Sequence, residues 1–150
     1  MKKIHVILII LCIILIDQGL KIYIKTNYQY GEARQVFGEI FKLQFVENPG
    51  MAYGMKFGGN WGKLALTLFR MAAVIYGIFF IGKIIRKKYH WGFIVCVSLI
   101  FSGALGNLID SCFYGLIFDN GVGDYHFGGT IAKLSTHGYG HFLHGYVARC

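Results

Sequence analysis

The sequence predicts an all-α membrane protein that forms a single domain, with three transmembrane helices and a small extracytoplasmic β element between the first and the second. Apolar residues make up 55% of the 150 residues and charged residues only 15%, whereas soluble domains average about 25% charged residues. Three apolar stretches also reach the length of about 20 residues that a spanning helix needs. The composition therefore excludes disorder over most of the chain and disfavours a soluble nucleic-acid-binding protein, despite the net charge of +8.

We expect the three spans at residues 4–24, 64–82 and 91–109. At 1.5 Å per residue, each would be about 30 Å long, which is the thickness of the hydrocarbon core of a bilayer. No A-x-A-like cleavage site follows the first apolar stretch. We therefore expect this stretch to stay in the protein as a span, and not to be removed as a signal peptide.

Basic residues flank the spans in two clusters and predict the orientation. These residues are Lys2, Lys3, Lys83, Arg86, Lys87 and Lys88. Cytoplasmic loops of membrane proteins carry an excess of Lys and Arg, and both clusters fall on the same side of a three-span chain. We therefore expect a multi-pass protein with a cytoplasmic N-terminus and extracytoplasmic segments at residues 25–62 and 111–150.

The segment between the first two spans is amphiphilic. Within it, Gln35–Val46 contains β-branched and aromatic residues in partial alternation with polar ones. Such a pattern is typical of strands. We expect two or three short strands there, forming a small element on the membrane surface.

Ionisable residues inside a membrane span are costly, so each is a candidate functional residue. Asp17 and Lys21 are four residues apart in the first span, a spacing that permits an ion pair on one helix face. Such a pair is equally compatible with a purely structural role that locks helix packing. Arg70 lies near the outer end of the second span, where its long side chain can also serve as an interfacial anchor.

The third span ends in a face of small and polar residues. Gly103, Gly106, Asn107 and Asp110 follow one another at helical spacing and share this face. Small residues allow a neighbouring helix to approach closely, so packing alone is an alternative explanation. We expect this face to need a covering helix, because without one Asn107 and Asp110 would face lipid or a water defect, at a cost of about 2–3 kcal/mol for the aspartate. Since the polar groups of all three spans lie toward the outer ends, one shared site is the favoured interpretation.

Three short motifs resemble those of the lipoprotein signal peptidase family, also called signal peptidase II. Residues 17–21 resemble D-Q-x-x-K, residues 48–54 resemble N-x-G-x-A-[FW]-G with Tyr53 as the aromatic residue, and residues 103–110 resemble G-A-x-G-N-x-x-D-R, with Ser111 in place of the arginine. Each motif alone is weak, but together they occur in the order and topology of the family. The chain is most similar to the longer Bacteroidetes-type members.

The resemblance implies a function and a set of roles. Members of the family are aspartic endopeptidases of the bacterial inner membrane that cut signal peptides from diacylglyceryl-modified prolipoproteins. Asn48, with Gly50 in the same motif, is similar to a substrate-contacting residue. Asn107 and Asp110 resemble residues that position the catalytic loop, while Asp17 and Lys21 resemble stabilisers of the first helix, with Arg70 as a further supporting residue.

The end of the chain departs from the family pattern. The resemblance places the first catalytic aspartate at Arg149, and the second aspartate and a fourth helix beyond residue 150. We therefore expect no catalytic residue among these positions. The chain reads as a family member that is truncated or frame-shifted near residue 146, with an inactive site.

The expected partners are prolipoprotein signal peptides and membrane lipid, with no nucleic acid. The tail contains four histidines, His126, His137, His141 and His144. They lie among glycines that disfavour a helix, so we expect no metal site there. We also expect no cofactor. Two other functions stay open. One is a non-catalytic membrane protein that binds lipid-anchored peptides, and the other is a small transporter subunit with Asp17, Arg70 and Asp110 along a polar pathway.

The predicted orientation is testable by cysteine labelling. In a chain whose native cysteines are replaced, Lys87→Cys is expected to resist a membrane-impermeant thiol reagent in intact cells, because the loop at residues 83–90 should face the cytoplasm. The same residue should label after the cells are permeabilised. Strong labelling in intact cells would contradict this orientation.

Overall fold

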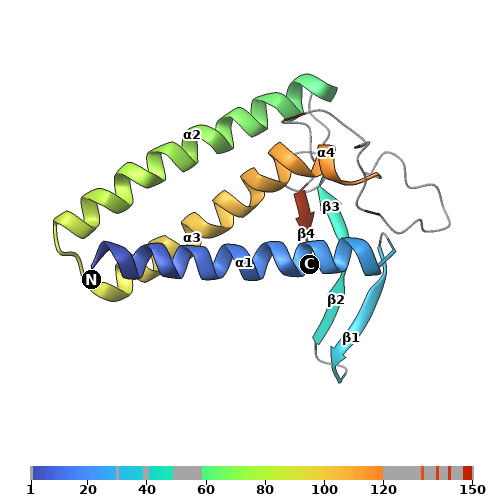
Figure 1. Ribbon diagram of the computed structural model, residues 1–150, viewed down its shortest axis with the longest axis horizontal. Coiled ribbons are helices and arrows are strands. Elements are labelled where there is room, and N and C mark those ends of the chain that lie inside the picture. Colours follow the sequence, from blue (N-terminus) through green and yellow to red (C-terminus); the bar gives the residue numbers. More distant parts are fainter. Residues whose placement is uncertain are drawn as a thin grey trace.

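The computed structural model describes residues 2–29, 31–38, 41–48, 59–119, 133, 138, 142 and 147–149. Three long helices dominate it: α1 (Lys3–Asn27), α2 (Gly59–Arg86) and α3 (Trp91–Ile109). The central helix is α3, because it packs against both α1 and α2 (Figure 1). The small strands gather at the end of the bundle where α1 finishes, while the N-terminus lies beside the start of α3 at the opposite end.

Within the described residues, three helical segments are long and apolar enough to cross a membrane, which confirms the predicted fold class. They are Lys3–Asn27, Trp61–Arg86 and Trp91–Ile117. The third is longer than predicted, because a π-helical turn, η2 (Asp110–Tyr114), and the short helix α4 (Gly115–Ile117) continue it beyond Ile109. The predicted span ended at residue 109, but Asp110 is fully buried inside the protein, so the helical backbone continues through it.

The apolar core joins all three helices. Val6 of α1 packs in one cluster with Val74 and Ile84 of α2 and with Ile94 and Phe101 of α3. Other large apolar side chains point outward, as expected for helices that contact lipid. The core is therefore narrow, and close helix contacts carry much of the packing.

Small residues make these contacts possible. Ser98 and Ser102 of α3 are buried, and each hydroxyl donates to the carbonyl oxygen four residues earlier in the same helix, at 2.7 Å. The serines therefore need no polar partner on α2. Opposite them, Gly77 of α2 lies so close to Phe101 that a Cβ atom would stand 2.6 Å from the aromatic ring.

In the part of the chain that the structure describes, four short strands form two antiparallel pairs. β1 (Ala33–Phe37) pairs with β2 (Phe41–Gln44), and β3 (Val46–Asn48) pairs with β4 (Val147–Arg149). The prediction of two or three strands around 35–46 is confirmed. The partner of β3 was not predicted, because a three-residue strand about 100 residues away along the chain carries no local signal of its own.

A surface ion pair stabilises the start of the β1–β2 hairpin. Arg34 Nε donates to Glu32 Oε1 at 2.6 Å, and the backbone N–H of Gln29 donates to Glu32 Oε2 at 2.7 Å. The hydrogen bond from Arg34, followed by that from Gln29, holds the pKa of Glu32 below its usual value. This pair ties the hairpin to the chain that leaves α1.

The close contact between α2 and α3 predicts an asymmetric response to two glycine substitutions. Gly77→Val should lower the stability of the protein by about 1–3 kcal/mol, because the added methyl groups overpack the contact with Phe101. Gly82→Val, on the same helix with no atom near its Cβ position, is the matched control. Unfolding in detergent micelles, followed by circular dichroism, measures both. Equal losses would show that helix propensity, and not packing, sets the effect.

Candidate functional site

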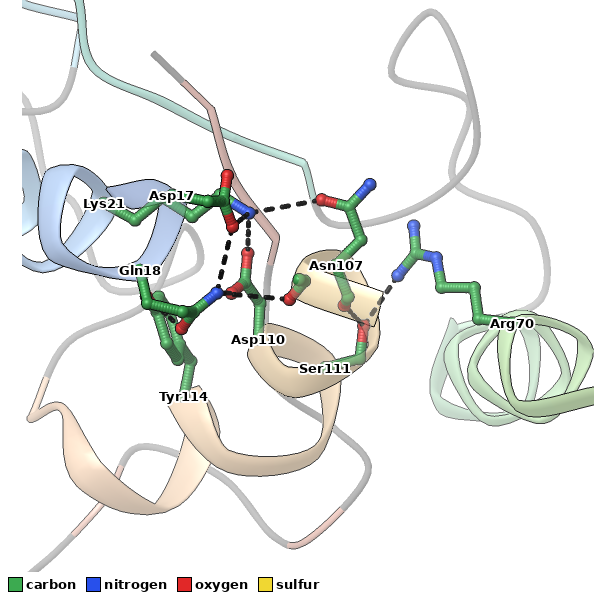
Figure 2. A network of polar contacts seen from close by, with 9 residues as sticks. Asp17, Gln18, Lys21, Arg70, Asn107, Asp110, Ser111 and Tyr114 are labelled. Carbon is green, nitrogen blue, oxygen red and sulfur yellow. Dashed lines mark hydrogen bonds and ion pairs between the residues drawn. The ribbon is translucent and has the colours of Figure 1, made fainter. Parts of the chain in front are cut away.

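Buried polar side chains join α1 to the end of α3 (Figure 2). Lys21 lies at the centre: its Nζ is 2.9 Å from Asp17 Oδ2 and 2.9 Å from Asp110 Oδ2, and it donates to Asn107 Oδ1 at 3.3 Å. Lys21 is 5% exposed and Asp110 is fully buried. The structure thus brings together four residues that the sequence analysis selected. We call this region, with its neighbours described below, the polar end of the bundle.

Gln18 is the second connector between the two helices. Its Nε2 donates to Asp110 Oδ1 at 2.9 Å and to the Gly106 carbonyl oxygen at 3.3 Å, while its Oε1 accepts from the Tyr114 hydroxyl at 3.1 Å. The two oxygens of Asp110 are therefore engaged by different groups of α1. A carboxylate held in this way, with Oδ2 in an ion pair with Lys21 and Oδ1 accepting from Gln18, is fixed in position.

The expectation that Asp110 would face lipid in the absence of a further helix is wrong. α1 covers it, since Lys21 neutralises its charge and Gln18 satisfies its second oxygen. Desolvating a carboxylate is costly unless it is paired and hydrogen-bonded. The first helix meets both conditions, so this face needs no additional covering element for Asp110.

Gly106 permits the close approach of α1 and α3 at this point. A Cβ atom on Gly106 would lie 2.4 Å from Asp17 Oδ2, so any larger residue there would push the acidic side chain away. Gly103, which the sequence placed on the same face, is exposed and has no atom within 4 Å of its Cβ position. The seam therefore starts at Gly106, and the inclusion of Gly103 in it was wrong.

Arg70 reaches the polar end from α2. Its Nη1 donates to Ser111 Oγ at 2.6 Å, and this hydroxyl in turn donates to the Asn107 carbonyl oxygen at 2.9 Å. Arg70 therefore points toward α3 instead of serving only as an interfacial anchor. Ser111 occupies the motif position at which the signal peptidase II motif has an arginine. In this chain, the guanidinium of Arg70 on α2 reaches that position instead.

Lys25 and Glu47 form a second buried pair one turn beyond Lys21. Lys25 Nζ contacts Glu47 Oε1, and both residues are at most 2% exposed. The ammonium group also lies 4.8 Å from the centre of the Phe118 ring, which favours a cation–π contact. Since Glu47 belongs to β3, this pair fixes the strand to α1 directly before Asn48.

The β3–β4 pair places the remaining predicted positions. Asn48 lies opposite Val147, and Arg149 lies opposite Val46. Because residues opposite each other or two apart share one face of a ladder, positions 48 and 149 are on the same face. β4 contacts both η2 and α1, so the backbone at position 149 lies at the polar end. Gly50 and the four tail histidines lie outside the described residues.

Several members of this region were not selected from the sequence: Gln18, Lys25, Glu47, Ser111 and Tyr114. Gln18 and Glu47 stand next to selected residues, and Lys25 follows Lys21 by one helical turn, so their position is the only signal by which the sequence could have identified them. The described residues contain no group of three His, Cys, Asp or Glu side chains that would suit a metal ion.

Comparison with known proteins gives consistent matches. The family model described as signal peptidase (SPase) II matches residues 9–129. A lipoprotein signal peptidase of Porphyromonas gingivalis is 41% identical over 142 residues, which cover 93% of this chain and 58% of the relative. The corresponding protein of Amoebophilus asiaticus is 40% identical over 119 residues, covering 75% of this chain and 49% of the relative.

A solved structure is also similar. It is a bacterial membrane enzyme determined by the in meso method at 2.3 Å resolution, with a TM-score of 0.52 and 29% sequence identity. The match covers 71% of this chain and 62% of that chain. The present chain thus spans 58% of the length of the Porphyromonas gingivalis relative and 49% of that of the Amoebophilus asiaticus relative.

The buried charges of the polar end predict a rescue between two substitutions. Lys21→Met should destabilise the protein by about 3–5 kcal/mol, because it leaves Asp110 as an uncompensated buried charge. Adding Asp110→Asn should recover part of this loss, since the unpaired charge is then removed. Unfolding titrations in mixed micelles measure the three stabilities.

Lys42→Met is the matched control, because Lys42 is exposed on β2 and surface substitutions usually change stability by about 0.5 kcal/mol or less. If the double variant were less stable than Lys21→Met alone, the ion pair would not be the source of the effect.

Proposed function

The chain belongs to the signal peptidase II family, and we propose that it carries the substrate-binding and supporting part of a lipoprotein signal peptidase. The substrates would be signal peptides of diacylglyceryl-modified prolipoproteins, held in the membrane next to the polar end. Membership in the family supports the general activity. The substrate's lipid modification and the aspartic type of the chemistry are implied by the motifs alone.

The observation that carries the proposal is the convergence of two motifs on one buried network. Asp17 and Lys21 come from the first motif, and Asn107 and Asp110 come from the third. Residues about 90 positions apart thus meet through direct polar contacts. In this proposal the network holds the end of α3 rigid, so that the strand pair beside it can present position 48 to a peptide.

Asp110 is a supporting residue in this proposal and not a catalytic one. An aspartic protease needs two carboxylates that share a proton, one to activate water and one to donate to the substrate carbonyl. Asp110 has one oxygen on Lys21 and the other on Gln18. Its geometry suits the positioning of neighbouring segments, and it leaves the reaction to carboxylates elsewhere.

We propose further that these 150 residues by themselves do not cleave the substrate. Position 149, where the resemblance places the first catalytic aspartate, carries arginine. A guanidinium stays protonated at any physiological pH and cannot accept a proton from water. The same observation favours a second candidate function, in which the chain binds lipid-anchored signal peptides without cutting them.

The proposed location is the bacterial inner membrane, with the N-terminus in the cytoplasm. The distribution of Lys and Arg supports this orientation. It places the polar end at the outer surface of the membrane, which is where the signal peptide of an exported lipoprotein would need to be cut.

Activity toward a lipidated precursor tests the proposal. The 150-residue chain is expected to show no cleavage in a gel-shift assay, because the loss of the acid and the base removes two contributions of about 10²–10⁴-fold each. Arg149→Asp alone should also be inactive, since one carboxylate is not a dyad. A chain extended by the C-terminal segment of a homologue, with both aspartates in place, should cleave.

The control is the same extended chain with one of the two aspartates replaced by asparagine. Binding of the lipidated peptide to the unmodified 150-residue chain is measured in parallel, and saturable binding without cleavage is the result that the proposal predicts. Cleavage by the unmodified chain would overturn the inactivity and make Asp110 and Asp124 the next candidates.

A further inference from the structure

The two ends of the helical bundle differ completely in charge. All seven carboxylates lie at or beyond residue 17, and residues 1–16 and 71–109 contain none. The end formed by the N-terminus and the α2–α3 turn, which we call the basic end, carries only cations: Lys2, Lys3, Lys83, Arg86, Lys87 and Lys88. Within the part of the chain that the structure describes, Lys83 and Lys87 form no ion pair. No described carboxylate therefore supplies their counter-charge.

A pocket at this end has the composition of a site for an amphiphilic anion. It has a volume of about 170 Å³, and it is lined by Phe80, Lys83, Ile84, Lys87, Tyr89 and Phe93. Lys83 lies in the last turn of α2, and Lys87 follows directly after its last residue with its backbone N–H donating to the Lys83 carbonyl oxygen at 3.0 Å, so the two lysines are one helical turn apart and project from the same face. The rest of the lining is apolar or aromatic, and the rings of Tyr89 and Phe93 contact each other at 5.6 Å between their centres.

The position of the pocket limits what can occupy it. It lies between the ends of two helices that are long and apolar enough to cross a membrane, where lipid headgroups surround the protein. Phe79 and Ile100 of the same helices expose more than 70% of their surface, so apolar chains can continue from the pocket along the bundle. The pocket is too small for a whole phospholipid, but it offers space for the headgroup.

We propose that this pocket binds the headgroup of an anionic phospholipid. The phosphate lies between the ammonium groups of Lys83 and Lys87, which reach it while their aliphatic stems rest on the helix surface. The glycerol backbone contacts Tyr89 and Phe93, and the acyl chains follow the outward apolar faces of α2 and α3. Basic pockets between transmembrane helices are suited to such lipids. The site is independent of the peptide-binding role, because it lies at the opposite end of the bundle.

Lipid titrations of the purified chain test this site. The delipidated protein in neutral detergent is titrated with phosphatidylglycerol or with phosphatidylcholine of the same acyl chains, and bound lipid is counted by native mass spectrometry. The protein should prefer phosphatidylglycerol, and the preference should weaken as salt increases, because the lysines are exposed. Equal binding of the two lipids would overturn the proposal. This titration uses only the unmodified chain, so its result does not depend on whether a variant folds.

The variants separate a built site from diffuse attraction. Lys83→Ala with Lys87→Ala should weaken phosphatidylglycerol binding about 30-fold, since each lysine contributes about 1 kcal/mol near an anionic lipid and 1.4 kcal/mol corresponds to tenfold. Lys83→Arg with Lys87→Arg should retain binding. Lys2→Ala with Lys3→Ala is the matched control, because it removes two cations from the same end outside this pocket and should change binding by about threefold or less, owing to screening.

Two results would contradict the assignment. An equal loss in the control and the pocket variants would show general attraction to the basic end and no defined site. Competition by inorganic phosphate or glycerol 3-phosphate at the same concentration as phosphatidylglycerol would show that the lysines recognise a free phosphate and not a lipid.

Discussion

The buried carboxylate of Asp110 is the constraint on which the polar end of the protein depends. A carboxylate that is fully removed from solvent is costly unless it is paired with an opposite charge and hydrogen-bonded. Lys21 and Gln18 provide these contacts, and both belong to α1. They are within reach only because Gly106 allows α1 to approach α3 closely. The buried charge therefore depends on its two partners, and these partners depend on Gly106 to bring α1 within reach.

The second buried pair extends this arrangement to the strands. Lys21 and Lys25 project from successive turns of α1, and they meet Asp110 of the third helical segment and Glu47 of β3. α1 thus fixes two chain segments that follow it at very different distances along the sequence. At the opposite end of the bundle, the described residues include no carboxylate beside the cations. The proposed lipid site would supply the counter-charge there, in contrast to the polar end, where side chains of the protein supply it.

Much of the fold could be predicted from the sequence, because the length and hydropathy of a spanning helix are local properties. The three helices were found on that basis, and the strands near residues 35–46 were found from their alternating pattern. The motif residues Asp17, Lys21, Asn107 and Asp110 were selected because ionisable and polar groups are costly within apolar spans. The pairing of β3 with β4, the continuation of α3 through Asp110, and the Lys25–Glu47 pair were not found, because each depends on contacts between distant parts of the chain.

The sequence by itself determined the number of spans, their approximate positions, the clustering of cations and the residues that belong to recognisable motifs. Only the tertiary structure decided which partner each charge takes. Asp110 was expected to need a covering helix, yet it is α1 that covers it. Gly103 was expected in the helix seam, yet only Gly106 lies there. The physical reason is that burial and ion pairing depend on distances between helices, and a one-dimensional pattern specifies the face of a helix but not the neighbour that this face will meet.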